Sequence, residues 1–435
     1  MRTQLTAKIF SDDQVRAVAG SFPTPFFLYS VDVIRERMRS LRGAFNNLFQ
    51  LAVSLKANPN PTLLRKLAGD VEWVDVASLG EYYLARLAEI PASKMLFIGP
   101  GKTIAELEAV IGESIGLLVV ESREEINHIE RISRACGKRT NVLLRINPNF
   151  GRVAAGIQMS GVASQFGIDA NELGMAMDLL KRLEHVCFKG IHVYLGTQML
   201  DAMALANNFR SVLALANAMR DLYGEPVSVI DFGGGFGVPY FPHEKPLDIK
   251  TLGREVIELF SKEAEALRAQ GCTFLIESGR FLFADAGIYV CSVLYKKQSY
   301  GTQYLILDGG SNFHSSLSGL GKLIRTNFPF YSVPRHSGES SVLKEQQTGF
   351  HLAGPLCTPL DILARNALVE HHDCGDLIVF EKAGAYGLTF SQEKFLSHTS
   401  ISELAFDRGR VDLIKRRKGI RDLAFEYDIP ARTEG

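Results

Sequence analysis

Lys56 follows the apolar run of residues 50–55, a place where a lysine side chain is costly to bury. Burial disfavours the charged form of an amine, so such a lysine either keeps its ammonium in water or is retained for chemistry. An amine with a lowered pKa can form a Schiff base with an aldehyde cofactor. Lys56 alone leaves both interpretations open, and four further patches of the sequence bear on the choice.

Three consecutive glycines at positions 233–235 follow a predicted strand that ends near Asp231. Glycines let backbone N–H groups approach an anion closely, and such a nest suits a phosphate. A tight turn between a strand and a helix is the alternative, but it requires only one glycine or two. The run therefore favours an anion site, with Gly234 and Gly235 as candidates.

The sequence Glu277-Ser-Gly-Arg280 places a carboxylate and a guanidinium at another predicted strand end. A structural ion pair is one interpretation. In the other, Glu277 hydrogen-bonds a pyridinium nitrogen and keeps the ring protonated, which lets the ring accept the electron pair released at Cα. Arg280 would then anchor a phosphate or fix Glu277.

Two further candidates lie in turns nearer the C-terminus. Tyr386 lies between Gly384 and Gly387, and it is either a core tyrosine or a hydroxyl that donates to a phosphate. Cys357 is either a buried cysteine or the acid that returns a proton to a substrate carbon. Taken together, the patches supply what pyridoxal phosphate requires of a protein.

Short β-rich runs alternate with helical patterns from about residue 30 to residue 285. Strands separated by helices imply parallel pairing, and eight such units close into a (β/α)8 TIM barrel. An open doubly wound sheet is the alternative. Lys56, Thr197 and Arg280 all follow strand ends, where barrels keep their chemistry, which favours the barrel. The predicted strands are residues 49–55, 73–76, 95–98, 116–120, 141–146, 189–193, 227–232 and 273–276.

The character of the sequence changes after Arg280. Separate strands, turns and few helices predict a C-terminal all-β, barrel-like domain over residues 286–435. The pyridoxal-phosphate-binding barrel is expected over residues 30–285. Residues 1–29 hold a short helix and a strand-like segment that could join either domain, and packing with the β domain is one of the two alternatives.

Composition narrows the class of protein. The formal net charge of the 435 residues is zero, so nothing favours nucleic acid or an anionic membrane surface as a partner. The first residues lack the apolar stretch of a signal peptide, and no run reaches membrane-spanning length. Six scattered cysteines without a C-x-x-C pair are typical of a reducing cytosol and give no hint of a metal site. We therefore expect a cytoplasmic enzyme.

In combination, these patches resemble the fold-III pyridoxal-phosphate decarboxylases, the group of ornithine and diaminopimelate decarboxylases. The resemblance extends from about residue 24 to residue 418 and includes Asp75-Val-Ala-Ser78, Arg145-Ile-Asn-Pro and Gln165-Phe-Gly. It implies a cofactor-binding barrel followed by a β domain. It also implies a head-to-tail homodimer whose active sites take the cysteine loop from the partner subunit.

The resemblance implies a role for each matching residue. Lys56 becomes the Schiff-base lysine, Glu277 contacts the ring nitrogen, Cys357 donates a proton, and Gly235 and Tyr386 contact the phosphate. The remaining cofactor contacts that it implies are Asp75, Arg145, Tyr194, Thr197, Gly234, Gly279 and Arg280.

One departure from the family pattern concerns the ring that stacks on the cofactor. The segment His192-Val-Tyr194-Leu-Gly-Thr197 has a tyrosine where the family usually has that histidine. His192 would share the face of Tyr194 on a strand but lie nearer the barrel interior. We therefore expect Tyr194 to stack and His192 to contact substrate. Thr197 replaces a phosphate-binding serine, which is a mild change.

A second departure concerns the substrate. The family's ornithine and diaminopimelate enzymes have an acidic residue directly after the cysteine, where it pairs with the distal ammonium of the substrate; here that residue is Thr358. A hydroxyl cannot neutralise an ammonium, and a desolvated unpaired cation is costly. Asp361 is spaced like a second acidic residue of the family and is the remaining candidate for that contact.

The motifs of one subgroup match better still. They resemble those of decarboxylases that act on L-glutamate tethered to an acyl carrier protein, as in butirosin biosynthesis, or on citryl-diamino-acid intermediates of siderophores. A carrier protein would need a basic docking patch, and residues 415–421 are a candidate, with a solvated tail as the plainer interpretation. Four alternatives are weighed: diaminopimelate decarboxylase in lysine biosynthesis, an amino-acid racemase, a catalytically dead regulatory homologue, and a small pyridoxal-phosphate homeostasis protein, which is a single barrel and so is disfavoured by the β domain.

Overall fold

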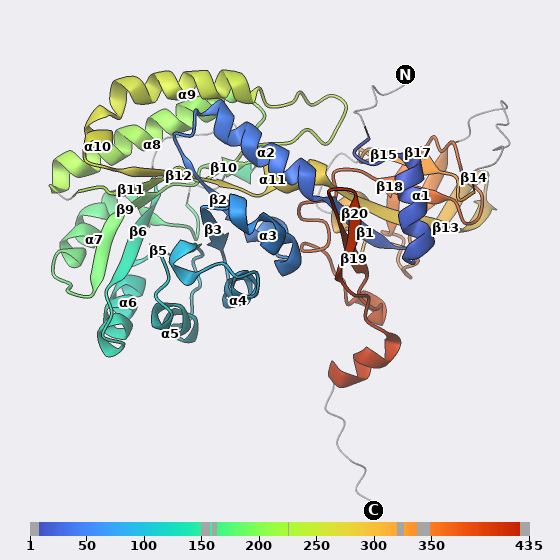
Figure 1. Cartoon of the computed structure of the whole chain (residues 1–435), viewed down its shortest axis with the longest axis horizontal. Coiled ribbons are helices and arrows are strands. Elements are labelled where there is room, and N and C mark those ends of the chain that lie inside the picture. The colour runs from blue at the N-terminus through green and yellow to red at the C-terminus, as the bar shows by residue number, and fades with distance from the viewer. Residues whose placement is uncertain are drawn as a thin grey trace, which may run out of the picture. The chain divides into compact units, whose positions relative to one another are not determined.

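The chain forms two compact units in a computed structural model, which describes residues 8–148, 157–158, 163–224, 226–319, 326–336 and 349–426 (Figure 1). The barrel unit comprises Ile34–Pro239 and Glu244–Leu282. The β unit comprises Met1–Val33, Tyr240–His243 and Phe283–Gly435, so the N-terminal segment groups with the C-terminal strands. No helix in the described part of the chain has the length and apolarity to cross a membrane.

The barrel unit contains a closed ring of parallel strands. Each strand pairs with the next, and the last, β12, pairs with the first, β2, while β8 (Ile168–Asp169) extends from β6. The predicted barrel is confirmed, and the open doubly wound sheet is wrong. The strands of the ring are β2 (Gln50–Ser54), β3 (Trp73–Val76), β4 (Met95–Phe97), β5 (Leu117–Val120), β6 (Thr140–Asn147), β9 (Val186–His192), β11 (Val229–Asp231) and β12 (Thr273–Ser278).

Polar residues in the loops after the strands cap the N-termini of the helices that follow. Ser78 and Ser122 accept backbone N–H bonds at the starts of α4 and α6, and Thr103 forms a capping box with Glu106 at α5. The helices are α2 (Val31–Ala44), α3 (Pro61–Leu67), α4 (Leu79–Leu87), α5 (Ile104–Gly112), α6 (Arg123–Ala135), α7 (Leu173–Leu180), α8 (Ala202–Tyr223), α9 (Ile249–Glu263), α10 (Glu265–Ala269) and α11 (Arg280–Phe283).

A cluster of aromatic rings packs α8 and α9 against the barrel. The Phe49 ring lies 5.4 Å from that of Phe209 on α8 and 5.2 Å from that of Phe260 on α9, between ring centroids. Phe232 and Phe274 extend the cluster onto the loop after β11 and onto β12. Such edge-to-face packing fixes the two helices against the β11–β12 side of the barrel.

The β unit is built around strand β1, which comes from the N-terminal segment. β1 pairs with β13 in antiparallel and with β19 in parallel orientation, and α1 (Asp12–Ser21) contributes Val15 and Val18 to the core beneath. The predicted mostly-sheet C-terminal region is confirmed. The strands of the unit are β1 (Phe26–Ser30), β13 (Gly287–Ser299), β14 (Thr302–Leu307), β15 (Phe330–Val333), β16 (Phe350–Ala353), β17 (Ile362–Ala367), β18 (Leu377–Phe380), β19 (Ser402–Asp407) and β20 (Arg410–Lys415).

Short elements complete the described chain. The two-residue strands β7 (Ile157–Gln158) and β10 (Gly196–Thr197) pair with each other. The 3-10 turns are η1 (Leu55–Ala57), η2 (Ala68–Asp70), η3 (Ala92–Lys94), η4 (Ala170–Glu172), η5 (Ala284–Ala286), η6 (Ser315–Ser318), η7 (Phe395–Ser397) and η8 (Ile420–Glu426).

Candidate active site

Lys56 lies in the turn η1, immediately after β2, at the end of the barrel where the strands finish. Its Nζ is 2.9 Å from Oδ2 of Asp75, which lies on the adjacent strand β3. The Lys56 side chain is 37 % exposed and that of Asp75 only 1 %. The amine therefore combines an opening to the outside with a buried counter-charge, an arrangement suited to a reactive lysine.

The electrostatics of Asp75 depend on Lys56. Burial raises the pKa of the Asp75 carboxyl, the charge of Lys56 opposes this, and the balance leaves the pKa above its ordinary value. Removing the amine would leave Asp75 buried without that cation, which favours its neutral form.

Tyr194 lies beside the same amine. Lys56 Nζ is 5.7 Å from the centroid of the tyrosine ring. Burial raises the pKa of the phenol, and the Thr197 side chain hydrogen-bonds it. Tyr194 is therefore a neutral aromatic ring next to Lys56, a placement that agrees with a stacking role.

His192 lies deeper, at the end of β9, and hydrogen-bonds Glu277. Its Nε2 is 2.9 Å from Glu277 Oε1, and neither side chain is more than 2 % exposed. Burial alone would raise the pKa of Glu277, but the hydrogen bond and charge of His192, then Lys56 and Arg145, lower it to about 2. Glu277 is therefore an ionised carboxylate inside the barrel. The contact with His192 was not predicted from the sequence.

The glycine run is required by close backbone packing. A Cβ on Gly234 would lie 2.5 Å from the Glu277 carbonyl oxygen, and one on Gly235, whose φ is +98°, 2.7 Å from that of Gly196. Larger residues would push these strand ends apart. Gly279 packs in the same way against the lysine turn, since its Cβ would meet that of Ala57 at 2.8 Å. Phosphate binding by this run stays a prediction.

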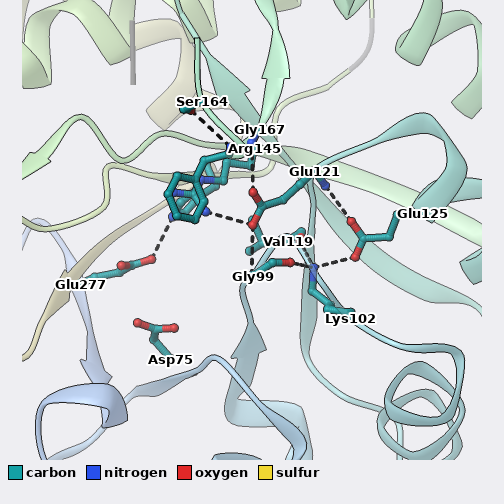
Figure 2. A network of polar contacts seen from close by, with 12 residues as sticks. Asp75, Gly99, Lys102, Val119, Glu121, Glu125, Arg145, Ser164, Gly167 and Glu277 are labelled. Atoms are coloured by element: carbon teal, nitrogen blue, oxygen red, sulfur yellow. Dashed lines mark hydrogen bonds and ion pairs between the residues drawn. The ribbon is translucent and has the colours of Figure 1, made fainter. Parts of the chain in front are cut away.

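Arg145, on β6, pairs with a residue that sequence reasoning missed. Its Nη1 donates to Glu121 Oε1 at 2.9 Å, with both side chains buried, and its guanidinium lies 4.5 Å from the Phe166 ring centroid (Figure 2). Glu121 also accepts the N–H groups of Gly99 and Gly167. Glu121 could have been predicted from the sequence, because it directly follows a predicted strand, as other site residues do.

Lys102 fixes the same rim of the barrel. Its side chain is 1 % exposed, and Nζ donates to the carbonyls of Gly99 and Val119, each at 2.7 Å, and to Glu125 at 2.6 Å (Figure 2). Glu125 in turn accepts the N–H of Glu121. The network holds Glu121, and through it Arg145, in place.

We predict that Lys102→Ala lowers the free energy of unfolding by about 3 kcal/mol, because removing one partner of a buried ion pair strands the other. Urea denaturation of the purified protein measures the change. Lys262→Ala is the matched control, because Lys262 pairs with Glu258 on the exposed face of α9 and should contribute little. Equal stability of the two variants would contradict a structural role for the network that links Lys102 through Glu125 to Glu121.

Three of the predicted site residues of the β unit lie in a tight turn at residues 354–361. Cys357 is exposed and Thr358 half-buried. Asp361 is buried, and its two carboxylate oxygens accept N–H bonds from Ser311 at 2.7 Å and Leu356 at 2.9 Å. These contacts make Asp361 a residue that holds the cysteine turn, and its contact with substrate stays a prediction.

Tyr386 lies in a strained turn of the β unit. Its φ is +57°, in the left-handed region that non-glycine residues rarely adopt. The flanking Gly384 has no room for a side chain, since its Cβ would lie 1.9 Å from the Phe283 carbonyl oxygen. Strain of this kind is found where a side chain is presented for function.

Arg280, another predicted site residue, begins α11 in the barrel unit.

Residues 31–284 match the family described as pyridoxal-dependent decarboxylase, pyridoxal binding domain. The chain belongs to this family. It is 39 % identical to the L-glutamyl-(BtrI acyl-carrier protein) decarboxylase of Niallia circulans over 94 % of both chains. It is 30 % identical to a 2-((L-alanin-3-ylcarbamoyl)methyl)-2-hydroxybutanedioate decarboxylase of Staphylococcus aureus, over 87 % of this chain and 93 % of that protein.

Solved structures agree with this assignment. Helicobacter pylori diaminopimelate decarboxylase, complexed with L-lysine, aligns over 95 % of this chain and 98 % of its own with a TM-score of 0.83 and 26 % identity. The protein is therefore a pyridoxal-phosphate-dependent decarboxylase. The donor set fits the cofactor, because a partly exposed amine lies near a buried ionised carboxylate and an aromatic ring.

The same interior region also holds a set of groups of the kind that bind metals. His192, Asp231 and Glu277 each place a nitrogen or carboxylate oxygen within 4.8 Å of the others. However, His192 Nε2 and Glu277 Oε1 are hydrogen-bonded to each other, so these two atoms are already partnered.

Proposed function

We propose that this decarboxylase acts on an amino acid whose far end is acylated, either as a thioester on a carrier protein or as a citryl-diamino-acid conjugate. The observation that carries the proposal is Thr358, which follows Cys357 where a carboxylate would be needed to pair with a distal ammonium. Asp361 does not replace that charge readily, because both its oxygens already accept backbone N–H groups. Two relatives support the proposal, since their names specify a carrier-bound glutamyl group and an acylated diamino acid.

In the proposed mechanism, bound pyridoxal phosphate supplies an electron sink for the pair released as the carboxylate leaves Cα. Lys56 Nζ, which lies 2.9 Å from Asp75, would hold the cofactor through its aldehyde carbon. Glu277 would accept a hydrogen bond from the ring nitrogen, and Tyr194 would stack on the ring. The residues proposed to contact the phosphate or to fix these groups are Arg145, Thr197, Gly234, Gly235, Gly279, Arg280 and Tyr386.

Cys357 is proposed to return a proton from Sγ to Cα after carbon dioxide leaves. Its exposure within a single chain agrees with a loop that completes the active site of a second copy. The proposed assembly is therefore a homodimer with shared sites, and the proposed setting is specialised biosynthesis in the cytoplasm, such as that of an antibiotic or a siderophore.

A complementation experiment tests this arrangement. We predict that Lys56→Ala, inactive alone, and Cys357→Ala, weakly active alone, together recover about a quarter of wild-type activity after dissociation and remixing. Half the dimers are then mixed, and each mixed dimer has one intact site of its two. Cofactor absorbance should persist in Cys357→Ala. A mixture no more active than its components would contradict shared sites.

The basic run at residues 415–421 is only partly available for a carrier protein. Lys415 ends strand β20, and its Nζ lies 3.4 Å from Oε1 of Glu393. Arg417 Nη2 donates to the Pro25 carbonyl at 2.7 Å. The interpretation of the run as a solvated tail does not hold for these two residues. Docking would depend on the exposed Arg416, Lys418 and Arg421.

The effect of the tether tests the proposed substrate class. The cofactor-loaded enzyme is given either carrier protein loaded with L-glutamate or free L-glutamate, each labelled in the carboxyl group on Cα. The labelled carbon dioxide that is released is measured. The expected result is rapid release from the tethered amino acid and little from the free one. A citryl-diaminopropionate conjugate is included as the second acylated candidate. Release from neither acylated compound would overturn the proposal.

A further inference from the structure

Three titratable side chains, those of His192, Asp231 and Glu277, meet inside the barrel. His192 and Asp231 are register partners on the adjacent strands β9 and β11, and Glu277 lies on β12, the next strand of the ring. A nitrogen or carboxylate oxygen from each lies within 4.8 Å of the others. We refer to these three residues as the interior cluster.

Hydrogen bonding within the interior cluster is directional. An ionised carboxylate can only accept, so the proton of the 2.9 Å contact lies on His192 Nε2 and is donated to Glu277 Oε1. Asp231 Oδ1 accepts the N–H of Gly233 at 2.8 Å. Among the described residues, His192 Nδ1 and Asp231 Oδ2 have no partner. The hydrogen-bonding capacity of His192 is therefore directed to Glu277.

The charges of the interior cluster are unequal. Burial, then the charge of Glu277, raises the pKa of Asp231 well above its ordinary value, whereas Glu277 stays ionised beside its histidine. The buried negative charge is thus located on Glu277, and burial favours the neutral form of Asp231. The other titratable or charged groups that face Glu277 from the elements around it are Lys56 after β2, Asp75 on β3, Arg145 on β6 and Tyr194 after β9.

We propose that His192 is a positioning residue, which holds Glu277 ionised and aimed so that the ring nitrogen of the cofactor keeps its proton. A proton between a ring nitrogen and a carboxylate goes to whichever is the stronger base in place. Without the His192 donor, buried Glu277 would take that proton, and the ring would be a poorer electron acceptor. This inference rests on the role proposed for Glu277, and it replaces the predicted contact of His192 with substrate.

The test reads the ring nitrogen directly. Enzyme loaded with 15N-labelled pyridoxal phosphate is examined by 15N NMR in the wild type, His192→Leu, His192→Gln and Glu277→Gln. The glutamine at position 192 retains an amide N–H donor without a titrating ring. We expect a protonated nitrogen in the wild type and His192→Gln, and a neutral one in His192→Leu and Glu277→Gln. In His192→Leu, kcat should also fall about 10- to 100-fold with KM little changed, as for other supporting contacts.

The outcomes separate the two claims. A neutral nitrogen in Glu277→Gln but a protonated one in folded His192→Leu would overturn the role of His192 alone. A protonated nitrogen in Glu277→Gln would overturn the role of Glu277 and the inference with it. Circular dichroism reports folding, and His192→Met makes the same comparison if the leucine variant does not fold.

Discussion

Lys56→Ala is expected to abolish decarboxylation, with a loss of activity of roughly 10³-fold or more, as for other residues that form a covalent bond in catalysis. The reason is geometric as well as chemical. Lys56 is the amine at the end of β2, its Nζ is 2.9 Å from buried Asp75, and the Tyr194 ring lies beside it. Substitution removes both the nucleophile and the counter-charge of Asp75.

Borohydride reduction followed by peptide mass spectrometry measures the covalent link itself. In the wild type, the pyridoxyl group should be found on the peptide that contains Lys56, and in Lys56→Ala it should be absent. Lys94→Ala is the matched control, because Lys94 is an exposed lysine of the same unit, in η3. Labelling of another lysine in the wild type would show that the reactive amine has been misassigned.

Thr358→Glu is expected to reverse the substrate preference. It supplies the carboxylate that pairs with a distal ammonium, so kcat/KM for meso-diaminopimelate should rise by about 10- to 100-fold, equivalent to the ~1.5–3 kcal/mol of a hydrogen bond to a charged group. The acylated substrate should lose a similar factor, because its far end offers no cation and the new carboxylate would be desolvated without a partner.

Thr358→Gln separates charge from size, because glutamine has the shape of glutamate without its charge. It should impair the acylated substrate modestly and leave diaminopimelate a poor substrate. Steady-state kinetics on both substrates give the comparison. If Thr358→Gln and Thr358→Glu behaved alike, the charge at position 358 would not determine the preference.

The barrel could be predicted because parallel strands that are buried on both faces appear as continuous apolar runs. Leu117–Val120, for example, is buried at every position. The strands β15, β17 and β20, which are partly exposed, lack that signal. In β17 the exposed Arg365 and Asn366 interrupt the apolar pattern, and β20 exposes Arg410 and Asp412. Charged side chains on such strands look like loop or tail sequence.

Individual site residues could be predicted more readily than the contacts between them. Lys56 and Glu277 stand at strand ends, and that position is visible in the sequence. The bond between His192 and Glu277 joins strands separated by β11, and only the closed ring brings their side chains to 2.9 Å. The contacts of Asp361 could not be predicted either, because one of its oxygens accepts the N–H of Ser311, 50 residues away in the sequence, and the other that of Leu356 in its own turn.

A competition experiment tests the central claim most directly. Cofactor-loaded enzyme is given equal concentrations of a carrier-bound L-glutamyl thioester and meso-diaminopimelate, whose reacting carboxyl groups carry different carbon isotopes, and the isotope ratio of the released carbon dioxide is measured. The account predicts that the label of the acylated substrate dominates by about 100-fold or more, the scale set by the ~3 kcal/mol or more that an uncompensated buried charge costs. Carbon dioxide released mainly from diaminopimelate would contradict the account. It would mean that some other residue supplies the charge that Thr358 lacks and pairs with the distal ammonium.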